Sequence, residues 1–276
     1  MFHSRKYSAF LCAAFCSALL GVLTTSASAA DIKVPDRIKT AGKIVFCTDV
    51  GFPPWEMYDP NTQQPTGFDI DIAAAVSKAM GVKSEHKNIG FDGLIPALMA
   101  NQCDAIISGF YDKPERAKVV DFANYAQTGS SVIVKAASNS NAKSLKDFSG
   151  QKVAVGIGTA GETTMNETNE ALKAEGKSEI TVVAVQTSAE AFQQLAVGLV
   201  QGYLGSTDQA AYYNKQQPGS VKLQGEQIVA LPTGIATRPN DKELHEAFLQ
   251  AISAIKANGD YDAALKTWGF EALALH

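Results

Sequence analysis

The sequence is poor in the residues that mark several common classes of protein. Only four histidines and four cysteines occur among 276 residues, and two of the cysteines lie within the first thirty. His86, His245 and His276 stand apart from any cysteine cluster, so we expect neither a metal nor a cofactor. Basic residues number 24 against 28 acidic ones, which argues against nucleic-acid binding because that depends on neutralising phosphates.

Long apolar runs are also scarce. The run at residues 9–23 spans fifteen residues, whereas about twenty are needed to cross a bilayer. It follows Arg5 and Lys6 and precedes the small residues TTSASAAD, which is the pattern of a secretory signal peptide. We expect residues 1–30 to be removed near Ala29 or Ala30 and the mature chain to be periplasmic. An uncleaved membrane anchor and lipid attachment are the weaker alternatives.

Export would place the remaining cysteines, Cys47 and Cys103, in an oxidising compartment where they could pair. We expect them at opposite ends of neighbouring parallel strands. The α-carbons of such positions lie beyond the roughly 7 Å limit for a disulfide. The sequence therefore predicts two free thiols.

From residue 43 onward, short apolar runs alternate with helical patterns, as in α/β proteins whose helices cover a mostly parallel sheet. Strands are expected at 43–48, 103–109, 151–157, 180–185 and 201–206. Helices are expected at 67–81, 91–102, 161–176, 188–199 and 207–216. A polar stretch at 138–144 separates two α/β units, and an extended segment at 228–238 precedes two more helices within 240–269.

Three glycines, Gly156, Gly158 and Gly161, lie between an expected strand and helix with the spacing of a dinucleotide-binding turn. A nucleotide site also requires an acid about twenty residues later, but the next strand ends in residues 186–188, which are Gln, Thr and Ser. The N–H groups and dipole at a helix start would still attract a small anion. A tight turn without any ligand is an equal alternative.

Arg116 follows the expected strand at 103–109, and its guanidinium can hold a carboxylate through two parallel N–H groups. Two anion-holding features at strand ends of two α/β units predict one carboxylate in a cleft between them. Phe52, Trp55 and Phe91 could form an aromatic wall for the body of a ligand. Core packing is the alternative for each of these aromatic residues.

Four acids surround the beginning of the expected helix at 67–81 and the strand before it. Asp49 follows that strand and could offer a negative charge to a ligand. For Glu56, Asp69 and Asp71 we expect capping or solvated roles, because acids near a helix start are stabilised by the helix dipole.

Ordered motifs over residues 38–270 resemble the periplasmic solute-binding proteins that serve ABC importers of polar amino acids. The motifs are TDVGFPPWE, GFDIDIAAAV, FDGLIPALMANQCDAIISG, PERAKVVDF, VAVGIGTAGE and NGDYDAALKTWG. The resemblance implies an α/β fold of two lobes, the type II periplasmic-binding-protein clamshell. Lobe one would comprise residues 31–134 plus 230–276 and lobe two residues 135–229, with hinges at 130–138 and 227–235.

The resemblance also assigns roles by position. Arg116 would bind the carboxylate of the ligand, and Thr159 and Ala160 of lobe two would donate hydrogen bonds to it. An acid near the ligand side chain, two flanking aromatic residues and a strand end complete the implied site, namely Asp49, Phe52, Phe91, Ser108 and Gly109.

Two positions depart from the family pattern. Family members usually hold the ammonium of the ligand with an aspartate of lobe two and a hydroxyl of lobe one, where this chain has Ser206 and Tyr111. A buried ammonium without an anion is costly. Either Asp208 or Asp112 supplies the charge from a shifted position, or the ligand lacks a free α-ammonium.

The resemblance implies a monomeric receptor without catalytic residues, which closes around an amino acid or a similar small carboxylate and presents it to a membrane permease. The alternative is an exported enzyme on the same fold, such as a cyclohexadienyl dehydratase, which needs a general acid near the lobe-two turn. Glu162 lies one place away from the position that such enzymes use. A sensing domain of a receptor is a third interpretation, weakened because no signalling segment precedes His276.

Overall fold

The computed structural model describes residues 1–2 and 32–275, so the expected signal peptide at 1–30 lies outside the described residues except for its first two. None of the helices described there is both long and apolar enough to span a lipid bilayer.

One eight-stranded sheet runs through the molecule in the order β4-β1-β5-β10-β6-β9-β7-β8. The strands are β1 Lys43–Thr48, β4 Lys83–Asn88, β5 Ala105–Ile106, β6 Asp121–Lys135, β7 Lys152–Gly156, β8 Thr181–Val185, β9 Gly202–Ser206 and β10 Val221–Thr237. Strand β1 is parallel to β4 and β5, and β7 is parallel to β8 and β9. A separate hairpin consists of β2 Met57–Tyr58 and β3 Pro65–Thr66.

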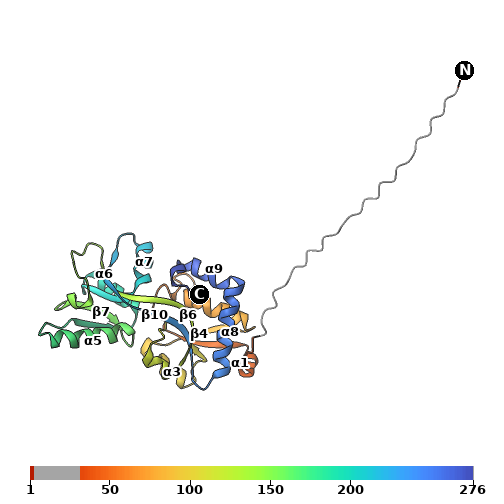
Figure 1. Cartoon of the computed structure of the whole chain (residues 1–276), viewed down its shortest axis with the longest axis horizontal. Helices are drawn as coiled ribbons and strands as arrows, with labels where there is room; N and C mark the ends of the chain where they lie inside the picture. Colours follow the sequence, from red (N-terminus) through yellow and green to blue (C-terminus); the bar gives the residue numbers. More distant parts are fainter. Residues whose placement is uncertain (3–31, 276) are drawn as a thin grey trace.

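Helices cover the faces of this sheet in two groups. The helices are α1 Asp36–Ala41, α2 Phe68–Ala79, α3 Leu94–Met99, α4 Pro114–Ala117, α5 Ala160–Ala174, α6 Ser188–Val197, α7 Thr207–Gln216, α8 Lys242–Asn258 and α9 Asp260–Trp268. We call the body around β1, β4 and β5 the first lobe and the body around β7, β8 and β9 the second lobe. Figure 1 shows the two lobes joined by β6 and β10, which confirms the predicted two-lobed α/β clamshell.

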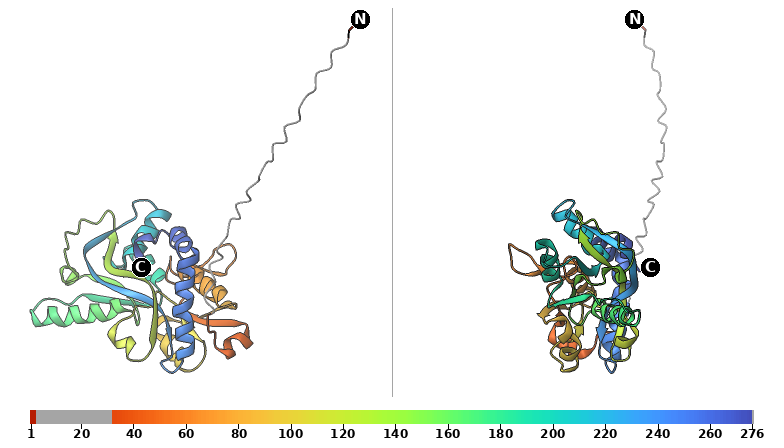
Figure 2. Two further views of the ribbon diagram at one scale, coloured as in Figure 1. Left: turned by 45° about the vertical axis from the view of Figure 1, so that its right-hand side comes forward. Right: turned by 90° about the vertical axis from the view of Figure 1, so that its left-hand side faces the viewer.

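Strands β6 and β10 connect the lobes because they pair antiparallel along nearly their whole length, from Val221↔Lys135 to Thr237↔Asp121. The views of Figure 2 show them lying side by side. Strand β10 also pairs with β5, and β6 also pairs with β9, so the pair joins the two parallel parts of the sheet. Motion of one lobe relative to the other must therefore bend these two strands.

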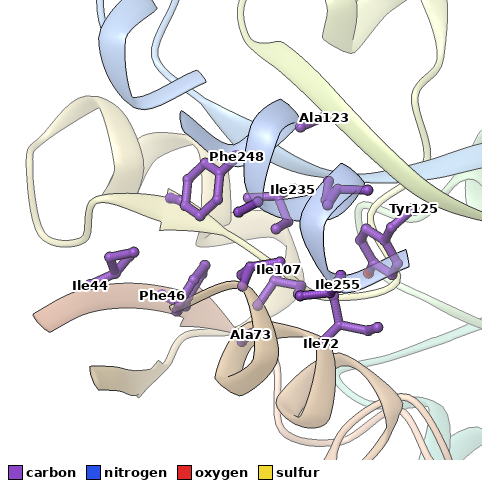
Figure 3. Packing of buried hydrophobic residues seen from close by; sticks show 14 of the residues in the cluster. Ile44, Phe46, Ile72, Ala73, Ile107, Ala123, Tyr125, Ile235, Phe248 and Ile255 are labelled. Carbon is purple, nitrogen blue, oxygen red and sulfur yellow. The ribbon is translucent and has the colours of Figure 1, made fainter. Parts of the chain in front are cut away.

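Each lobe has its own core. The first lobe packs α2 and α8 against β1, and Figure 3 shows Phe46, Ile72, Phe248 and Ile255 converging between them. In the second lobe, one apolar cluster around Val155 includes residues of β7 and α5, and another includes residues of β8, α6 and α7. Separate cores allow the lobes to move as units.

The expectation of two free thiols is wrong, because Cys47 and Cys103 form a disulfide with α-carbons 5.6 Å apart. The prediction began the strand at Cys103, whereas β5 begins at Ala105. Cys103 instead lies in the turn before β5, beside Cys47, and both side chains belong to the apolar cluster that α3 covers.

Strand β4 and the helix α1 have no counterpart in the sequence prediction. The six residues of β4, KSEHKN, are polar, and the strand lies at the edge of the sheet with β1 as its only neighbour. Apolar periodicity, the signal used for the other strands, is weak in a strand that is solvated along one edge.

Candidate functional site

A cavity lies between the lobes, at the carboxyl ends of β1 and β5 and opposite the turn that connects β7 to α5. Its volume is about 50 Å³. Its walls are formed by Asp49, Phe52, Phe91, Gly109, Tyr111, Arg116, Ser130, Gly156, Thr159, Ala160, Gly161, Gln186, Ser188, Tyr203, Leu204, Gly205 and Ser206. All predicted ligand-binding residues except Trp55 and Ser108 are therefore brought together, and their binding of a ligand stays a prediction.

Trp55 and Ser108 lie behind the cavity wall and are fully buried. The Ser108 hydroxyl accepts a hydrogen bond from the Asp49 N–H at 3.0 Å and donates one to Glu56 at 2.7 Å. The Trp55 ring is stacked with Phe52 at 6.1 Å between centroids. Both residues thus position wall residues without touching the cavity.

Arg116 is a buried cation in the wall, with 6% of its surface exposed. Its Nη1 donates to the Tyr111 carbonyl and its Nη2 to the Gly158 carbonyl, each at 3.2 Å. The guanidinium lies over the rings of Phe110 and Phe91, at 4.2 and 5.1 Å from their centroids. Burial lowers the pKa of Arg116 to about 10, so the group is charged at neutral pH.

No ion pair among residues 32–275 includes Arg116. A buried charge is costly unless it is paired. The two carbonyl groups satisfy only part of the guanidinium, which has five N–H donors. The arrangement can therefore accept an anion.

The turn at residues 156–161 approaches this guanidinium from the second lobe. Gly158 has a φ of +74°, and a Cβ there would lie 3.0 Å from the Asp92 backbone, so glycine permits both the turn and the contact between lobes. Thr159 is the N-cap of α5, and its side chain accepts from the Glu162 N–H at 3.3 Å. The positive end of a fifteen-residue helix therefore faces the cavity.

Two aromatic rings and one acid form another part of the wall. Gly109 has a φ of +48°, and a Cβ there would lie 2.5 Å from the Phe52 ring, so the glycine lets that ring lie against the backbone. Burial, together with the nearby charge of Asp92, raises the pKa of Asp49 to about 7. With a pKa near 7, the Asp49 carboxyl group can pair with a cationic group of a ligand or hydrogen-bond to a neutral donor.

Hydroxyl groups dominate the wall beside β6 and β9. Ser130 and Ser206 are paired in the register of these strands, and both line the cavity together with Tyr111. Sequence reasoning missed Ser130, Gln186, Ser188 and Tyr203, as well as the backbone of residues 204 and 205. Only the pairing of distant strands brings Ser130 to the cavity, and no local motif signals it.

Neither acid that could have replaced the missing aspartate lines the cavity. Asp112 accepts a hydrogen bond from Asn124 at 2.9 Å. Asp208 is held by Trp55 Nε1 at 2.7 Å, by the Thr128 hydroxyl at 2.7 Å and by the Ser206 hydroxyl at 3.0 Å. Both carboxylates are thus engaged by protein groups.

The expectation of capping or solvated roles is wrong for Glu56 and Asp69, which are fully buried beneath the cavity. Asp69 accepts from the Gly109 N–H and from the Tyr125 hydroxyl, the latter at 2.6 Å. Burial raises the pKa of both carboxyls. The prediction considered only the helix dipole, whereas Ser108, Gly109 and Tyr125 of β6 enclose these groups and hydrogen-bond to them away from water. Asp71 is partly buried and accepts from Trp268 Nε1 at 2.7 Å.

Other hydrogen bonds join the lobes around the cavity. The Ala189 N–H donates to the Gly51 carbonyl at 3.1 Å, and Gln209 Nε2 donates to the Pro53 carbonyl at 3.2 Å. The described conformation is therefore the closed one.

Comparisons with known proteins agree with this architecture. Residues 44–271 match the bacterial extracellular solute-binding proteins, family 3. The chain is 31% identical over 256 residues to the ABC transporter arginine-binding protein 1 of Escherichia coli (strain K12), covering 91% of this chain and 96% of that protein.

Two solved structures are similar over most of the chain. An ancestral arginine-binding protein bound to arginine is 36% identical with a TM-score of 0.74, covering 82% of this chain and 98% of that one. The ancestral amino acid-binding protein AncCDT-1, a precursor of cyclohexadienyl dehydratase, is 33% identical with a TM-score of 0.76, covering 84% and 98%.

Proposed function

We propose that the interlobe cavity holds the carboxylate of an amino acid or a similar small molecule, because this chain belongs to family 3 of the bacterial extracellular solute-binding proteins. The chain is the substrate-binding component of an ABC importer and delivers its ligand to a membrane permease. The observation that carries the proposed site is Arg116, a buried guanidinium without an acidic partner among the described residues.

In this proposal the carboxylate is held from both sides. Arg116 of the first lobe supplies two-pronged hydrogen bonding and charge. Thr159 and Ala160 supply donors and the positive end of α5 from the second lobe. Because the second set of contacts exists only when the lobes are closed, the ligand shifts the population toward the closed form.

The rest of the ligand would lie between Phe52 and Phe91, with Asp49 facing its far end. A cation there would pair with the Asp49 carboxylate, which supports a basic or donor side group such as that of arginine. Gly109 and Tyr111 supply the adjoining wall, while Ser108 and Trp55 position it from behind.

We also propose the finer organisation of the chain. Lobe one comprises residues 31–134 plus 230–276 and lobe two residues 135–229, and residues 1–30 act as a cleaved signal peptide for export to the periplasm. The protein acts as a monomer.

The proposed function excludes catalysis. Glu162, the acid nearest to the position that an enzyme would use, accepts a hydrogen bond from the Gly158 N–H at 2.7 Å and does not line the cavity. Its carboxylate caps the turn and is not directed at a substrate. Purified protein should therefore leave prephenate and arogenate unchanged, and turnover of either would establish the enzyme alternative.

The carboxylate role is tested by Arg116→Ala. A ligand that binds only the native state raises stability by RT ln(1 + [L]/Kd), so amino acids that stabilise the wild type in a thermal-shift screen should lose this effect in the variant. We expect affinity to fall at least about 100-fold, since a charged hydrogen-bonding pair is lost. Lys118→Ala, in an exposed residue that follows the same short helix, is the matched control and should bind normally. Unchanged affinity in Arg116→Ala would refute the site.

A further inference from the structure

The cavity wall contains one cationic and one acidic side chain, Arg116 and Asp49, and all its other lining residues are uncharged. No ion pair joins the two. Phe91 lines the same wall as Asp49, and its ring faces the Arg116 guanidinium at 5.1 Å from the ring centroid. The cavity therefore has a cationic corner at Arg116 and an acid corner at Asp49.

A third corner consists of the hydroxyl groups of Tyr111, Ser130 and Ser206, which we call the hydroxyl corner. In the sheet, β5 and β10 lie between β1 and β6. Neighbouring strands lie about 4.8 Å apart, so three spacings place the backbone at Asp49, after β1, roughly 14 Å across the sheet from that of Ser130 on β6. The Asp49 carboxylate cannot pair with a ligand group that occupies the hydroxyl corner.

The nearest acid behind the hydroxyl corner is Asp208, and its oxygens are already engaged. Three donors from three segments bind it, and one of them is Ser206 itself. The adjacent N-terminus of α7 adds a positive dipole end. A ligand cation in this corner would thus meet hydroxyl groups and no free anion.

The other buried acids also face away from this corner. Glu56 and Asp69 are bonded to Ser108, Gly109 and Tyr125. Asp112 is bonded to Asn124. Moving an ammonium out of water into such a neutral environment is unfavourable, whereas an amide or a hydroxyl is well matched to hydroxyl partners.

We infer that the ligand carries its charges at opposite ends: a carboxylate at the cationic corner, a cationic or donor group at the acid corner, and no charged group at the hydroxyl corner. This inference rests on the proposed function and narrows its ligand class. Nα-acylated basic amino acids and ω-guanidino or ω-amino carboxylates belong to the class, whereas basic amino acids with a free α-ammonium do not.

The test compares ligands that differ at a single corner, using the intact mature protein and calorimetric titration. Nα-Acetyl-L-arginine and 5-guanidinopentanoate, which is arginine without its α-ammonium, should bind at least 10-fold more tightly than L-arginine, and agmatine, which has no carboxylate, should not bind. If L-arginine binds as tightly as the other two, the inference is overturned and the proposed function stands. If no amino acid or small carboxylate in a broad screen binds, the proposed function fails as well.

A second test moves a charge into the hydroxyl corner. Ser206 is the N-cap of α7, where Asp and Asn are as well tolerated as Ser, so both Ser206→Asp and Ser206→Asn should fold. Ser206→Asp should shift the preference toward L-arginine at least 10-fold relative to Nα-acetyl-L-arginine. Ser206→Asn, which has the same size as Asp but no charge, should not show this shift toward L-arginine. Equal preferences in the two variants would contradict the assigned corner.

Discussion

Beneath the binding cavity, Glu56 and Asp69 form a buried pair of acids. Glu56 Oε2 has no hydrogen-bond partner when both carboxyls are ionised. Because burial raises the pKa of both carboxyls, we expect one proton to be shared by Glu56 and Asp69, which would provide that partner and remove the repulsion of two buried charges. Through Ser108 and the Gly109 N–H, the pair fixes backbone that lines the cavity. Residues without ligand contact therefore determine the shape of the wall.

The pair makes stability depend on pH. Burial raises the pKa of Asp69 to about 6 and that of Glu56 above its ordinary value. Because both folded-state values exceed the unfolded ones, this contribution to stability is present below pH 4 and is lost as the pH rises through about 6. Glu56→Gln keeps the shape and can donate to Asp69. In urea unfolding, the wild type should lose more stability than Glu56→Gln between pH 5 and pH 8.

Glu246→Gln, in an exposed residue of α8, serves as the control and should follow the wild type. Parallel pH profiles for the wild type and Glu56→Gln would show that the pair is not protonated in the native state.

At this scale the sequence predicted cavity residues that follow strand ends, such as Asp49 and Arg116, since parallel strands place their carboxyl ends along one edge. It did not reveal Ser130 or Tyr203, whose positions depend on pairing between strands far apart in the chain. It also misjudged Glu56, because its burial and its bond to Ser108, 52 positions away, leave no local signature.

Among the secondary-structure elements, β1 is the one most firmly fixed. It pairs with β4 and β5 on its two sides, and the Cys47–Cys103 disulfide ties it to the turn before β5. The strand ends one residue before Asp49, so its position fixes the acid corner. The sequence predicted β1 itself from KIVFCT. It did not predict the disulfide, because apolar patterning does not mark the turn that contains Cys103 and delays the start of β5 to Ala105.

The disulfide should contribute strongly to stability, because it closes a loop between residues 56 positions apart. The chain-entropy relation gives about 4 kcal/mol for a loop of this length. The Cys47→Ala, Cys103→Ala double variant should therefore unfold at a lower urea concentration than the oxidised wild type. A thiol reductant should lower the urea midpoint of the wild type in the same way, and it should leave the midpoint of the double variant unchanged. Identical urea midpoints for the oxidised wild type, the reduced wild type and the double variant would contradict a stabilising disulfide between Cys47 and Cys103.

The molecule as a whole is held closed partly by contacts that involve no cavity residue. Trp55 Nε1 donates to Asp208 across the lobes, and Gln209 donates to Pro53 beside it. Such contacts favour the closed form with or without a ligand. The two-lobed architecture was predictable from the ordered motifs, but these bridges were not, since they join residues more than 150 positions apart.

Trp55→Phe should weaken closure and therefore binding. An aromatic ring remains, as it does in the control below, while a hydrogen bond to a buried carboxylate, of about 1.5–3 kcal/mol, is lost. Ligand affinity should fall about 10-fold or more, and the ligand-free variant should have a larger radius of gyration by small-angle scattering. Trp268→Phe removes an equivalent bond to Asp71 at 2.7 Å within the first lobe, so it should leave affinity unchanged. Equal affinity losses in both variants would contradict the closure role.

The core of the first lobe combines Phe46 and Ile72 with Phe248 and Ile255, from near the two ends of the chain. On the ribosome, the first pair is made about two hundred residues before the second, which takes roughly 10–40 s at ordinary rates of synthesis. During that interval the early strands and helix have no α8 to bury their apolar faces. The core of the first lobe can therefore be completed only after α8 has been synthesised.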